Sequence, residues 1–260
     1  SSDLRAFFYG AGSVRPFVTD AFWSRGIALT CAKSINAIPV AEFALGAVLL
    51  SLKRTWHHAA EVRRLGTYPS RLDAPGGFRS RVGLISFGSI ARRLRSLLEP
   101  FELDVSVHDP FLTPDQALAA KVTACPLEEI FRTCDIVSLH APMIAATRGM
   151  ITGALIRSMK PGATFINTAR GTLVDEDALI SALRDRPDLT ALLDVARREP
   201  PDAGSPLYHL PNVVLTPHLA GSLGRECERM GQFMIDEFDR WIRGERLHGT
   251  VTREAAALEA

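Results

Sequence analysis

Short apolar runs alternate with helical patterns through the middle of the chain, and this alternation constrains the fold more than any other feature. Strands that alternate with helices form βαβ units, which build a parallel sheet covered on both faces. Continuous apolar runs such as ALLDV, residues 191–195, suit such doubly buried strands. We therefore predict an α/β fold with a doubly wound parallel sheet of the Rossmann type. The predicted strands are Arg81–Ser86, Leu103–His108, Asp135–His140, Ala163–Asn167, Thr190–Val195 and Val213–Thr216. The helices predicted between them are Ile90–Leu98, Leu127–Arg132, Leu155–Met159 and Asp175–Arg184.

Two longer helices are predicted to flank this sheet. Residues Pro39–Lys53 are apolar, and Pro39 is placed in the first turn, where proline is tolerated. Residues Arg225–Arg243 are amphipathic and stop at Gly244, a residue typical of a helix end. The stretch Arg64–Arg81 is rich in glycine, proline and arginine, and it is predicted to be irregular.

The first 35 residues contain little structure of their own. Arg5–Tyr9 and Ile27–Thr30 are predicted strands, Thr19–Arg25 is a predicted short helix, and Gly10-Ala11-Gly12 forms a tight turn. About two strands do not make an independently stable domain. This segment is therefore expected to need partners that the sequence does not supply.

Composition excludes several classes of protein. The chain has 260 residues, a net charge of +1 and 47% hydrophobic residues, which argues against a nucleic-acid partner and against disorder. Its four cysteines form no C-x-x-C pair, so we predict reduced thiols and no metal site. The most apolar run, residues 37–52, is interrupted by Pro39 and Glu42 and is shorter than the roughly 20 residues of a membrane span. The N-terminus lacks the features of a signal peptide. We therefore expect a cytoplasmic protein without a membrane partner.

A turn of the dinucleotide-binding type follows the first predicted sheet strand. The glycine positions of a G-x-G-x-x-G turn hold Ser86, Gly88 and Ala91, with Ser89 and Ile90 between the last two. Gly88 lets the backbone approach a pyrophosphate, which would rest on the helix N-terminus.

An acid ends the next predicted strand. Asp109 lies 109 − 88 = 21 residues after Gly88, where a carboxylate accepts hydrogen bonds from the adenosine ribose and repels a 2′-phosphate. The two signals together favour NAD. The alternatives are a generic βα turn and an aspartate that opens an Asp-Pro turn.

Several motifs resemble the D-isomer-specific 2-hydroxyacid dehydrogenase family. The stretches that carry the resemblance are IPVAEFALGAVLLSLKR (38–54), LHAPMIAATRGMI (139–151), INTARGTLVDEDALISAL (166–183), LLDVARREP (192–200) and NVVLTPHLAGS (212–222). The resemblance extends over nearly the whole chain, and the motifs follow one another in the family's order. The resemblance implies an NAD-dependent enzyme that transfers hydride between the cofactor and a small 2-oxo or 2-hydroxy acid of the D-isomer.

The resemblance also implies roles for individual residues. Arg170 is similar to the substrate arginine, Glu199 to its paired acid and His218 to the acid/base, with spacings of 199 − 170 = 29 and 218 − 170 = 48. Asp194 resembles the aspartate that contacts the nicotinamide amide. The turn at Ala11 and Gly12 is similar to the loop whose N–H groups hold the substrate carboxylate. Together with Ser86, Gly88, Ser89, Ile90, Asp109, Asp194 and His218, the cofactor set comprises Pro142, Thr147, Thr168, Ala169 and Gly221.

The proposed chemistry explains these residue types. The side chain of His218 can act as the proton donor, because an imidazole titrates near working pH. Glu199 would orient the ring, and Arg170 would hold the carboxylate in a fork. The alternatives to these roles are that Arg170 is a solvated charge, that Glu199 is a surface acid and that His218 is a capping or packing residue. Arg197 and Arg198 either increase the acidity of Glu199 or point to solvent.

The family has two domains with catalysis between them. We expect the first part of a flavodoxin-like substrate domain to be missing, leaving residues 1–35 as its end, 36–222 as the NAD-binding domain and 223–260 as a helix that returns to the substrate domain. The resemblance further implies a homodimer paired through the region of the predicted helix 39–53. Two alternatives remain open, namely an NAD-sensing interaction protein similar to a corepressor and a degenerate paralogue.

Overall fold

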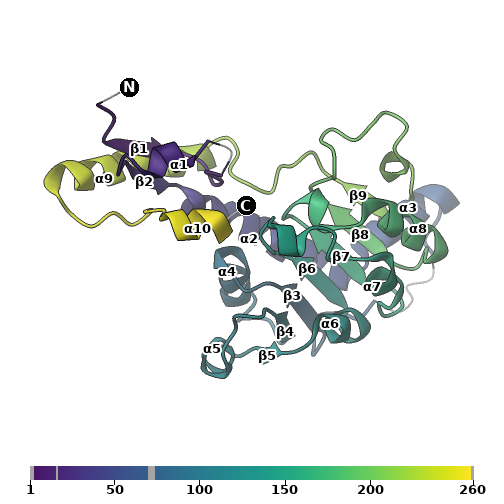
Figure 1. Ribbon diagram of the computed structural model, residues 1–260. Helices are drawn as coiled ribbons and strands as arrows, with labels where there is room; N and C mark the ends of the chain where they lie inside the picture. Colours follow the sequence, from purple (N-terminus) through teal and green to yellow (C-terminus); the bar gives the residue numbers. More distant parts are fainter. Residues whose placement is uncertain (1–2, 16, 70–73, 259–260) are drawn as a thin grey trace.

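A seven-stranded parallel sheet forms the larger of two lobes in a computed structural model that describes residues 3–15, 17–69 and 74–258 (Figure 1). All neighbouring strands in it pair in parallel, in the order β5-β4-β3-β6-β7-β8-β9. This arrangement confirms the predicted Rossmann-type fold. The strands are β3 (Arg81–Ile85), β4 (Asp104–His108), β5 (Thr123–Ala124), β6 (Ile136–Leu139), β7 (Thr164–Asn167), β8 (Thr190–Leu193) and β9 (Val213–Leu215).

The strand order reverses between β3 and β6. Ile85, the last residue of β3, pairs with His108 of β4 on one side and with Leu139 of β6 on the other. From β3 the chain runs outward to β5 and then returns to build β6 to β9 on the opposite side. Open α/β sheets bind ligands at such a switch point, outside the carboxyl ends of the strands.

Helices cover both faces of the sheet. On one face, α2 (Lys33–Leu52) and α4 (Ser89–Leu97) pack against each other and share an apolar cluster with β3 and β4. On the other face, a larger cluster includes the buried rings of Phe131 and Phe165. The helices that contribute to it are α6 (Leu127–Thr133), α7 (Gly153–Arg157) and α8 (Glu176–Asp185). A short helix, α5 (Pro114–Ala120), precedes β5.

Helix α2 begins six residues earlier than predicted. It runs from Lys33 to Leu52, so Pro39 lies inside the helix and not in its first turn. Pro39 and its neighbours Ala37 and Val40 are buried, and this packing compensates for the hydrogen bond that proline cannot donate. At 20 residues, α2 is the one helix among the described residues that is long and apolar enough to span a membrane. Half of its apolar window is buried against the rest of the protein, as in a core helix.

The smaller lobe combines both ends of the chain. The parallel pair β1 (Ala6–Tyr9) and β2 (Ala28–Cys31) flanks α1 (Asp20–Trp23), and α9 (Glu226–Arg243) lies beside the two strands (Figure 1). Phe8 contacts Phe238 of α9 edge to face, with ring centroids 5.6 Å apart. The chain then returns through α10 (Arg253–Leu258). These elements match the predicted flanking segments, including the stop of α9 at Gly244.

Strand β5 and helices α5 and α10 were not predicted, and neither was the helix that follows α2. Helix α3 (Thr55–Leu65) follows α2, although its end lies in the stretch expected to be irregular. It has no buried residue among those described, so it lacks the apolar periodicity from which a helix is predicted. Residues 70–73 of the same stretch lie outside the described residues.

A buried carboxylate on α9 joins this helix to β2 and to the segment that follows the helix. Glu237 is completely buried, and it accepts hydrogen bonds from Thr30 Oγ1 (2.9 Å), the N–H groups of His248 (2.9 Å) and Gly249 (2.8 Å), and Arg240 Nη1 (3.1 Å). Burial raises the pKa of Glu237, but these hydrogen bonds outweigh it and hold the pKa below its ordinary value.

We expect Glu237→Gln to destabilise the protein by about 3–5 kcal/mol, because the new amide turns its own donors toward the N–H groups that the carboxylate now satisfies. The lowered folded-state pKa means that the carboxylate stabilises the fold above its unfolded pKa of about 4.3 and loses this contribution as pH falls below it. Urea unfolding at pH 7 and at about pH 3 tests both points. Glu228→Gln, on the exposed side of the same helix, is the control. Equal midpoints for the two variants at pH 7 would contradict this role.

Candidate active site

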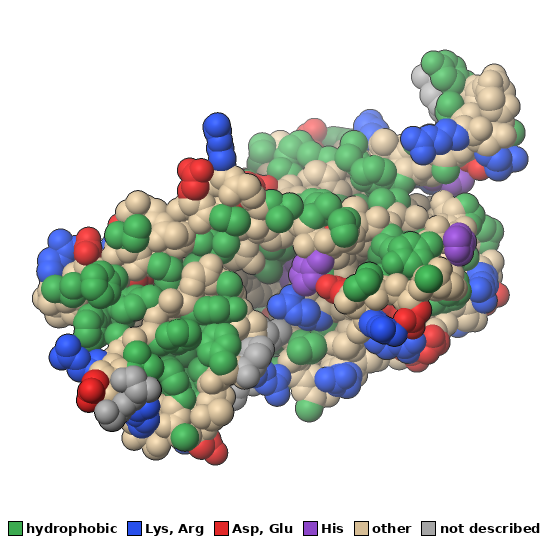
Figure 2. Space-filling model, turned by 90° about the horizontal axis from the view of Figure 1, so that it is seen from above, with side chains coloured by type: hydrophobic (Ala, Val, Ile, Leu, Met, Phe, Trp, Pro, Cys, Tyr) green, Lys and Arg blue, Asp and Glu red, His purple; other side chains and the backbone are tan. Residues whose placement is uncertain are grey.

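A cavity of about 790 Å³ lies at the carboxyl ends of β3 and β6, between the two lobes. Figure 2 looks into the hollow between the lobes, where basic side chains and a histidine lie at its edge. The volume falls within the roughly 300–1,000 Å³ that is usual for ligand sites. The wall includes most of the predicted site residues, which are Ala11, Gly12, Ser86, Gly88, Ser89, Ile90, Asp109, Pro142, Thr168, Ala169, Arg170, Asp194, His218 and Gly221.

Two predicted residues lie elsewhere. Thr147 does not belong to the described wall of the cavity, and its hydroxyl instead donates to Pro142 O (2.5 Å) and braces that loop. Glu199 lines an adjoining cavity and reaches the main one through His218.

The turn after β3 has the geometry of a dinucleotide site with one strained residue. Ser86 has φ of +70°, a conformation that glycine adopts without cost. A Cβ on Gly88 would meet no atom within 4 Å, so this glycine faces open space. Helix α4 starts directly afterwards without a side-chain cap, which leaves its first N–H groups available to an anion.

Asp109 braces this turn from the end of β4. Its Oδ2 accepts the N–H of Phe87 (2.7 Å) and the hydroxyl of Ser86 (3.3 Å), and its Oδ1 accepts the N–H of Phe111 (2.8 Å). The carboxylate therefore both orders the turn and lines the cavity. These bonds support the interpretation of Asp109 as the aspartate that opens an Asp-Pro turn, and its contact with an adenosine ribose stays a prediction.

We expect Ser86→Gly to stabilise the protein by about 0.5–1 kcal/mol. A left-handed conformation costs a residue with a Cβ roughly 1–2 kcal/mol, and the greater freedom of glycine in the unfolded chain cancels part of the gain. Ser86→Ala is the matched control, because it removes the hydroxyl and keeps the strained Cβ. Thermal unfolding should rank Ser86→Gly above the wild type and Ser86→Ala at or below it. The reverse ranking would show that Ser86 is not strained.

Two buried polar atoms on the cavity wall are left without a hydrogen bond by the described residues. His140 Nδ1 and Thr168 Oγ1 are buried and have no hydrogen-bond partner among the residues that the structure describes. Burial lowers the pKa of His140 to about 4, so the ring is neutral at pH 7, and its Nε2 lies 2.9 Å from Ser138 Oγ. Buried polar groups are normally paired. A polar ligand seated between these groups and the α4 N-terminus would satisfy them, as a dinucleotide does.

An imidazole and a carboxylate meet at the edge of the cavity. His218 Nδ1 lies 2.6 Å from Glu199 Oε2, and Glu199 Oε1 accepts the N–H of Ala196 (3.2 Å). Both side chains remain partly exposed, so Nε2 of His218 is available to the cavity. The two residues lie 19 positions apart in the sequence. They meet because Glu199 follows β8 and His218 follows β9, and these strands are neighbours in the sheet.

A close backbone contact holds the loop that carries Arg170 near Glu199 and His218. A Cβ on Gly171 would lie 1.9 Å from the carbonyl carbon of Ala196, so no residue with a side chain fits. This approach sets Arg170 beside the loop that carries Glu199. Arg170 Nη1 donates to Ala169 O (2.7 Å), and the guanidinium lines the cavity.

Asp194 holds the histidine turn in place. Its buried carboxylate accepts Thr216 Oγ1 (2.6 Å) and the N–H groups of Leu219 (2.9 Å) and Ala220 (2.9 Å), and its carbonyl accepts the N–H of His218 (2.9 Å). His218 has φ of +52°, and such strain persists only where the surroundings enforce it. The structure thus gives Asp194 a positioning task, and its contact with the nicotinamide amide stays a prediction.

The two arginines before Glu199 pair with other acids. Arg197 Nη1 lies 2.7 Å from Asp177 Oδ2, and its N–H donates to Glu176 (2.7 Å). Arg198 forms an ion pair with Asp202. Both arginine side chains are exposed, which agrees with the alternative that they point to solvent.

Several residues of the cavity wall were not predicted. They come from the first turn of α2, from α4, from the segment after β4 and from the end of β6. Each looks ordinary in the sequence, because an isolated lysine or phenylalanine has no motif around it. Among these residues are Lys33, Asn36, Arg92, Phe111 and His140.

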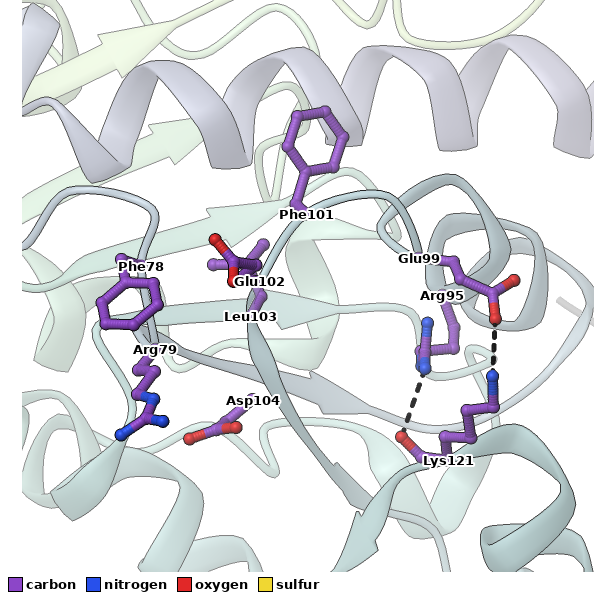
Figure 3. A pocket seen from close by; sticks show the side chains of 9 residues that line it. All are labelled: Phe78, Arg79, Arg95, Glu99, Phe101, Glu102, Leu103, Asp104 and Lys121. Carbon is purple, nitrogen blue, oxygen red and sulfur yellow. Dashed lines mark hydrogen bonds and ion pairs between the residues drawn. The ribbon is translucent and has the colours of Figure 1, made fainter.

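A second cavity, of about 310 Å³, lies at the amino ends of β3 and β4 (Figure 3). Three cationic and three acidic side chains line it, and they partly neutralise one another. Lys121 Nζ lies 2.9 Å from Glu99 Oε1, and Arg95 donates to Lys121 O (3.3 Å). Ligands of open α/β sheets bind at the opposite ends of the strands. The charge balance and the position distinguish this hollow from the candidate active site.

Comparisons with known proteins agree with this geometry. The family model described as "D-isomer specific 2-hydroxyacid dehydrogenase, NAD binding domain" matches residues 46–220. The (S)-sulfolactate dehydrogenase of Chromohalobacter salexigens is 36% identical over 242 residues, which are 92% of this chain and 77% of that protein. The D-3-phosphoglycerate dehydrogenase of Haemophilus influenzae is 35% identical over 84% of this chain, which spans 54% of that enzyme. This chain thus spans about half of that relative.

A solved structure shows the same arrangement. The NAD-complexed D-isomer-specific 2-hydroxyacid dehydrogenase of Lactobacillus delbrueckii ssp. bulgaricus superposes with a TM-score of 0.83 and 25% identity, covering 95% of this chain and 79% of that one. Fold and site define an NAD-binding oxidoreductase domain of the Rossmann type. The chain belongs to the D-isomer-specific 2-hydroxyacid dehydrogenase family, which confirms the predicted family, its class of reaction and its cofactor.

Proposed function

We propose that this protein reduces a small 2-oxo acid to the D-2-hydroxy acid with NADH and catalyses the reverse oxidation with NAD. The observation that carries the proposal is the 2.6 Å contact of Glu199 with His218, whose side chain lies on the wall that also holds Arg170 and the dinucleotide turn. The complete set of arginine, acid and histidine favours the enzyme over the cofactor-sensing alternative.

The residues of this chain divide the work of binding and proton transfer. Bound NAD(H) would supply or accept the hydride, with Asp109, the α4 N-terminus, His140 and Thr168 as its holding groups. Arg170 clamps the substrate carboxylate and draws electron density toward the carbonyl oxygen. The N–H groups at Ala11 and Gly12 contact the same carboxylate.

Proton transfer falls to the histidine pair. His218 donates a proton from Nε2 to the carbonyl oxygen as negative charge develops there, and it takes that proton back in the oxidation. Glu199 on Nδ1 keeps the ring oriented and stabilises its positive form. Asp194 holds in place the turn that positions the imidazole of His218, as the hydrogen bonds that it accepts from this turn indicate.

Substrate turnover is the direct test. Purified protein with NADH should consume NADH with at least one of glyoxylate, pyruvate, hydroxypyruvate, phenylglyoxylate, 3-sulfopyruvate and 3-phosphohydroxypyruvate. The last three are the oxo forms of mandelate, sulfolactate and phosphoglycerate, the acids in the names of similar dehydrogenases. Binding of NADH without turnover of any of these acids, by the protein with all domains of its natural chain, would overturn the proposal.

Related predictions follow from family membership. We propose a homodimer paired through the region of α2 and α3, a cytoplasmic location, and the domain division 1–35, 36–222 and 223–260. Helix α3 has no buried residue among those described, which supports the first of these, because its outer side is available to a second copy. Sedimentation at several concentrations measures the assembly state.

A further inference from the structure

A guanidinium connects the two lobes at the edge of the cavity. Arg15 Nη1 donates to the carbonyl oxygen of Met143 (2.9 Å), although the two residues lie 128 positions apart in the sequence. Arg15 follows the wall segment 11–13, which comes after β1 in the small lobe. Met143 follows the wall segment 140–142, which comes after β6 in the large lobe. The hydrogen bond therefore links the small lobe to the large one beside the cavity that both of them line.

Both ends of this hydrogen bond belong to loops that the fold holds in place. In the small lobe, the side chain of Val14 is buried in an apolar cluster with residues of β2. In the large lobe, Thr147 Oγ1 donates to Pro142 O (2.5 Å) and accepts the N–H of Ile144 (3.1 Å). The Arg15 bond therefore forms only while the two loops are close together, and it stabilises that arrangement of the lobes.

The polypeptide passes between the lobes through two connections that touch each other. One connection leads from β2 into α2, and the other leads from β9 to α9. Asn36 Oδ1 in the first accepts the N–H of Ser222 in the second (2.8 Å). Arg15 and Met143 belong to neither connection, so their hydrogen bond can break and form again while both connections persist. Such a reversible contact can shift the lobes between an open and a closed arrangement.

The groups assigned to the substrate come from both lobes. The loop at residues 11–12 lies in the small lobe, whereas Arg170 and His218 lie in the large lobe, and all of them line the cavity. Resting on the proposed function, we propose that Arg15 is a positioning residue whose hydrogen bond to Met143 holds these two sets of groups in register around a 2-oxo acid. Without this bond the lobes separate more often, and the substrate then meets only one of the two sets.

A pair of substitutions tests this role in kinetics. We expect Arg15→Met, which removes the donor, to lower kcat/KM for the preferred 2-oxo acid about 3- to 10-fold, the size of a charged hydrogen bond that stays exposed to solvent. Arg15→Lys keeps a cationic donor and should restore at least about half of the wild-type value. The Kd of NADH without a 2-oxo acid should change by less than about twofold, because the groups proposed to hold NADH all lie in the large lobe. Arg246→Met is the control, since Arg246 is exposed and outside the described wall of the cavity.

Distances between two spin labels measure the position of the lobes without turnover. The labels are attached at Ser24→Cys, after α1, and at Ser96→Cys, in α4, which are both exposed positions. Cys125 and Cys227 are replaced by serine so that they do not react with the label, and the remaining two cysteines are buried. Arg15→Met should add a population at longer distance, whereas Arg15→Lys and the control should keep the wild-type distribution.

The proposal requires both effects of Arg15→Met. An unchanged distance distribution would overturn it even if kcat/KM fell, because the arginine would then act through its charge alone. An unchanged kcat/KM would also overturn it, and in both cases the dehydrogenase would remain intact. A distance distribution that depends on Arg15, together with silence of all 2-oxo acids in turnover, would overturn only the proposed reaction.

Discussion

His218→Gln is expected to lower kcat by about two to four orders of magnitude in both directions, the usual contribution of a general acid or base. Glutamine keeps a polar side chain of similar reach, but its amide cannot deliver a proton to the carbonyl oxygen. The imidazole is placed for that task by Glu199 at 2.6 Å and by the hydrogen bonds that the N–H groups of its turn donate to Asp194. Steady-state kinetics with the preferred 2-oxo acid measures the loss.

Binding separates a chemical role from a structural one. The Kd of NADH, measured by fluorescence, should stay within about threefold for His218→Gln, because the dinucleotide turn is unchanged. His209→Gln is the control, since His209 is exposed and outside the described wall of the cavity. Glu199→Gln should lie between the two, with a loss of up to about 100-fold, because it leaves the ring present and weakens its orientation. Full activity of His218→Gln would remove the histidine from the mechanism.

Arg170→Lys is expected to lower kcat/KM by about 100- to 1,000-fold, although the positive charge is retained. A guanidinium binds a carboxylate through two parallel hydrogen bonds, and an ammonium on a flexible stem cannot reproduce this fork. Two charged hydrogen bonds of about 1.5–3 kcal/mol each account for a loss of this size. Part of the loss should appear in kcat, because the same group polarises the carbonyl.

The position of Arg170 makes this test specific. Gly171 lies in close contact with the backbone at Ala196, so the loop cannot shift to bring another cation to the same place. Arg148→Lys is the control, because Arg148 is exposed and lies outside the described wall of the cavity. A drop in kcat/KM below tenfold for Arg170→Lys would indicate that the arginine acts as a point charge and not as a fork.

The strands and the turn were predictable because they depend on local patterns. Apolar runs such as the one that forms β8 cannot be exposed, so their number and spacing already imply a parallel sheet with helices on both faces. Helix α3 escaped prediction because none of its described residues is buried, and α2 was predicted too short because the proline rule outweighed its apolar packing. Local rules fail where tertiary contacts supply what the local sequence lacks.

By itself, the sequence determined the sheet and the family and singled out Arg170, Glu199 and His218 as candidate catalytic residues, because motif spacing and apolar periodicity are read along the chain. Only the tertiary structure showed the left-handed Ser86, the task of Asp194 in holding the histidine turn, and the buried His140 Nδ1 on the cavity wall, which has no hydrogen-bond partner among the described residues. Those three features arise where segments distant in sequence meet, and the physical reason is that strain, hydrogen-bond saturation and charge balance are properties of neighbours in space.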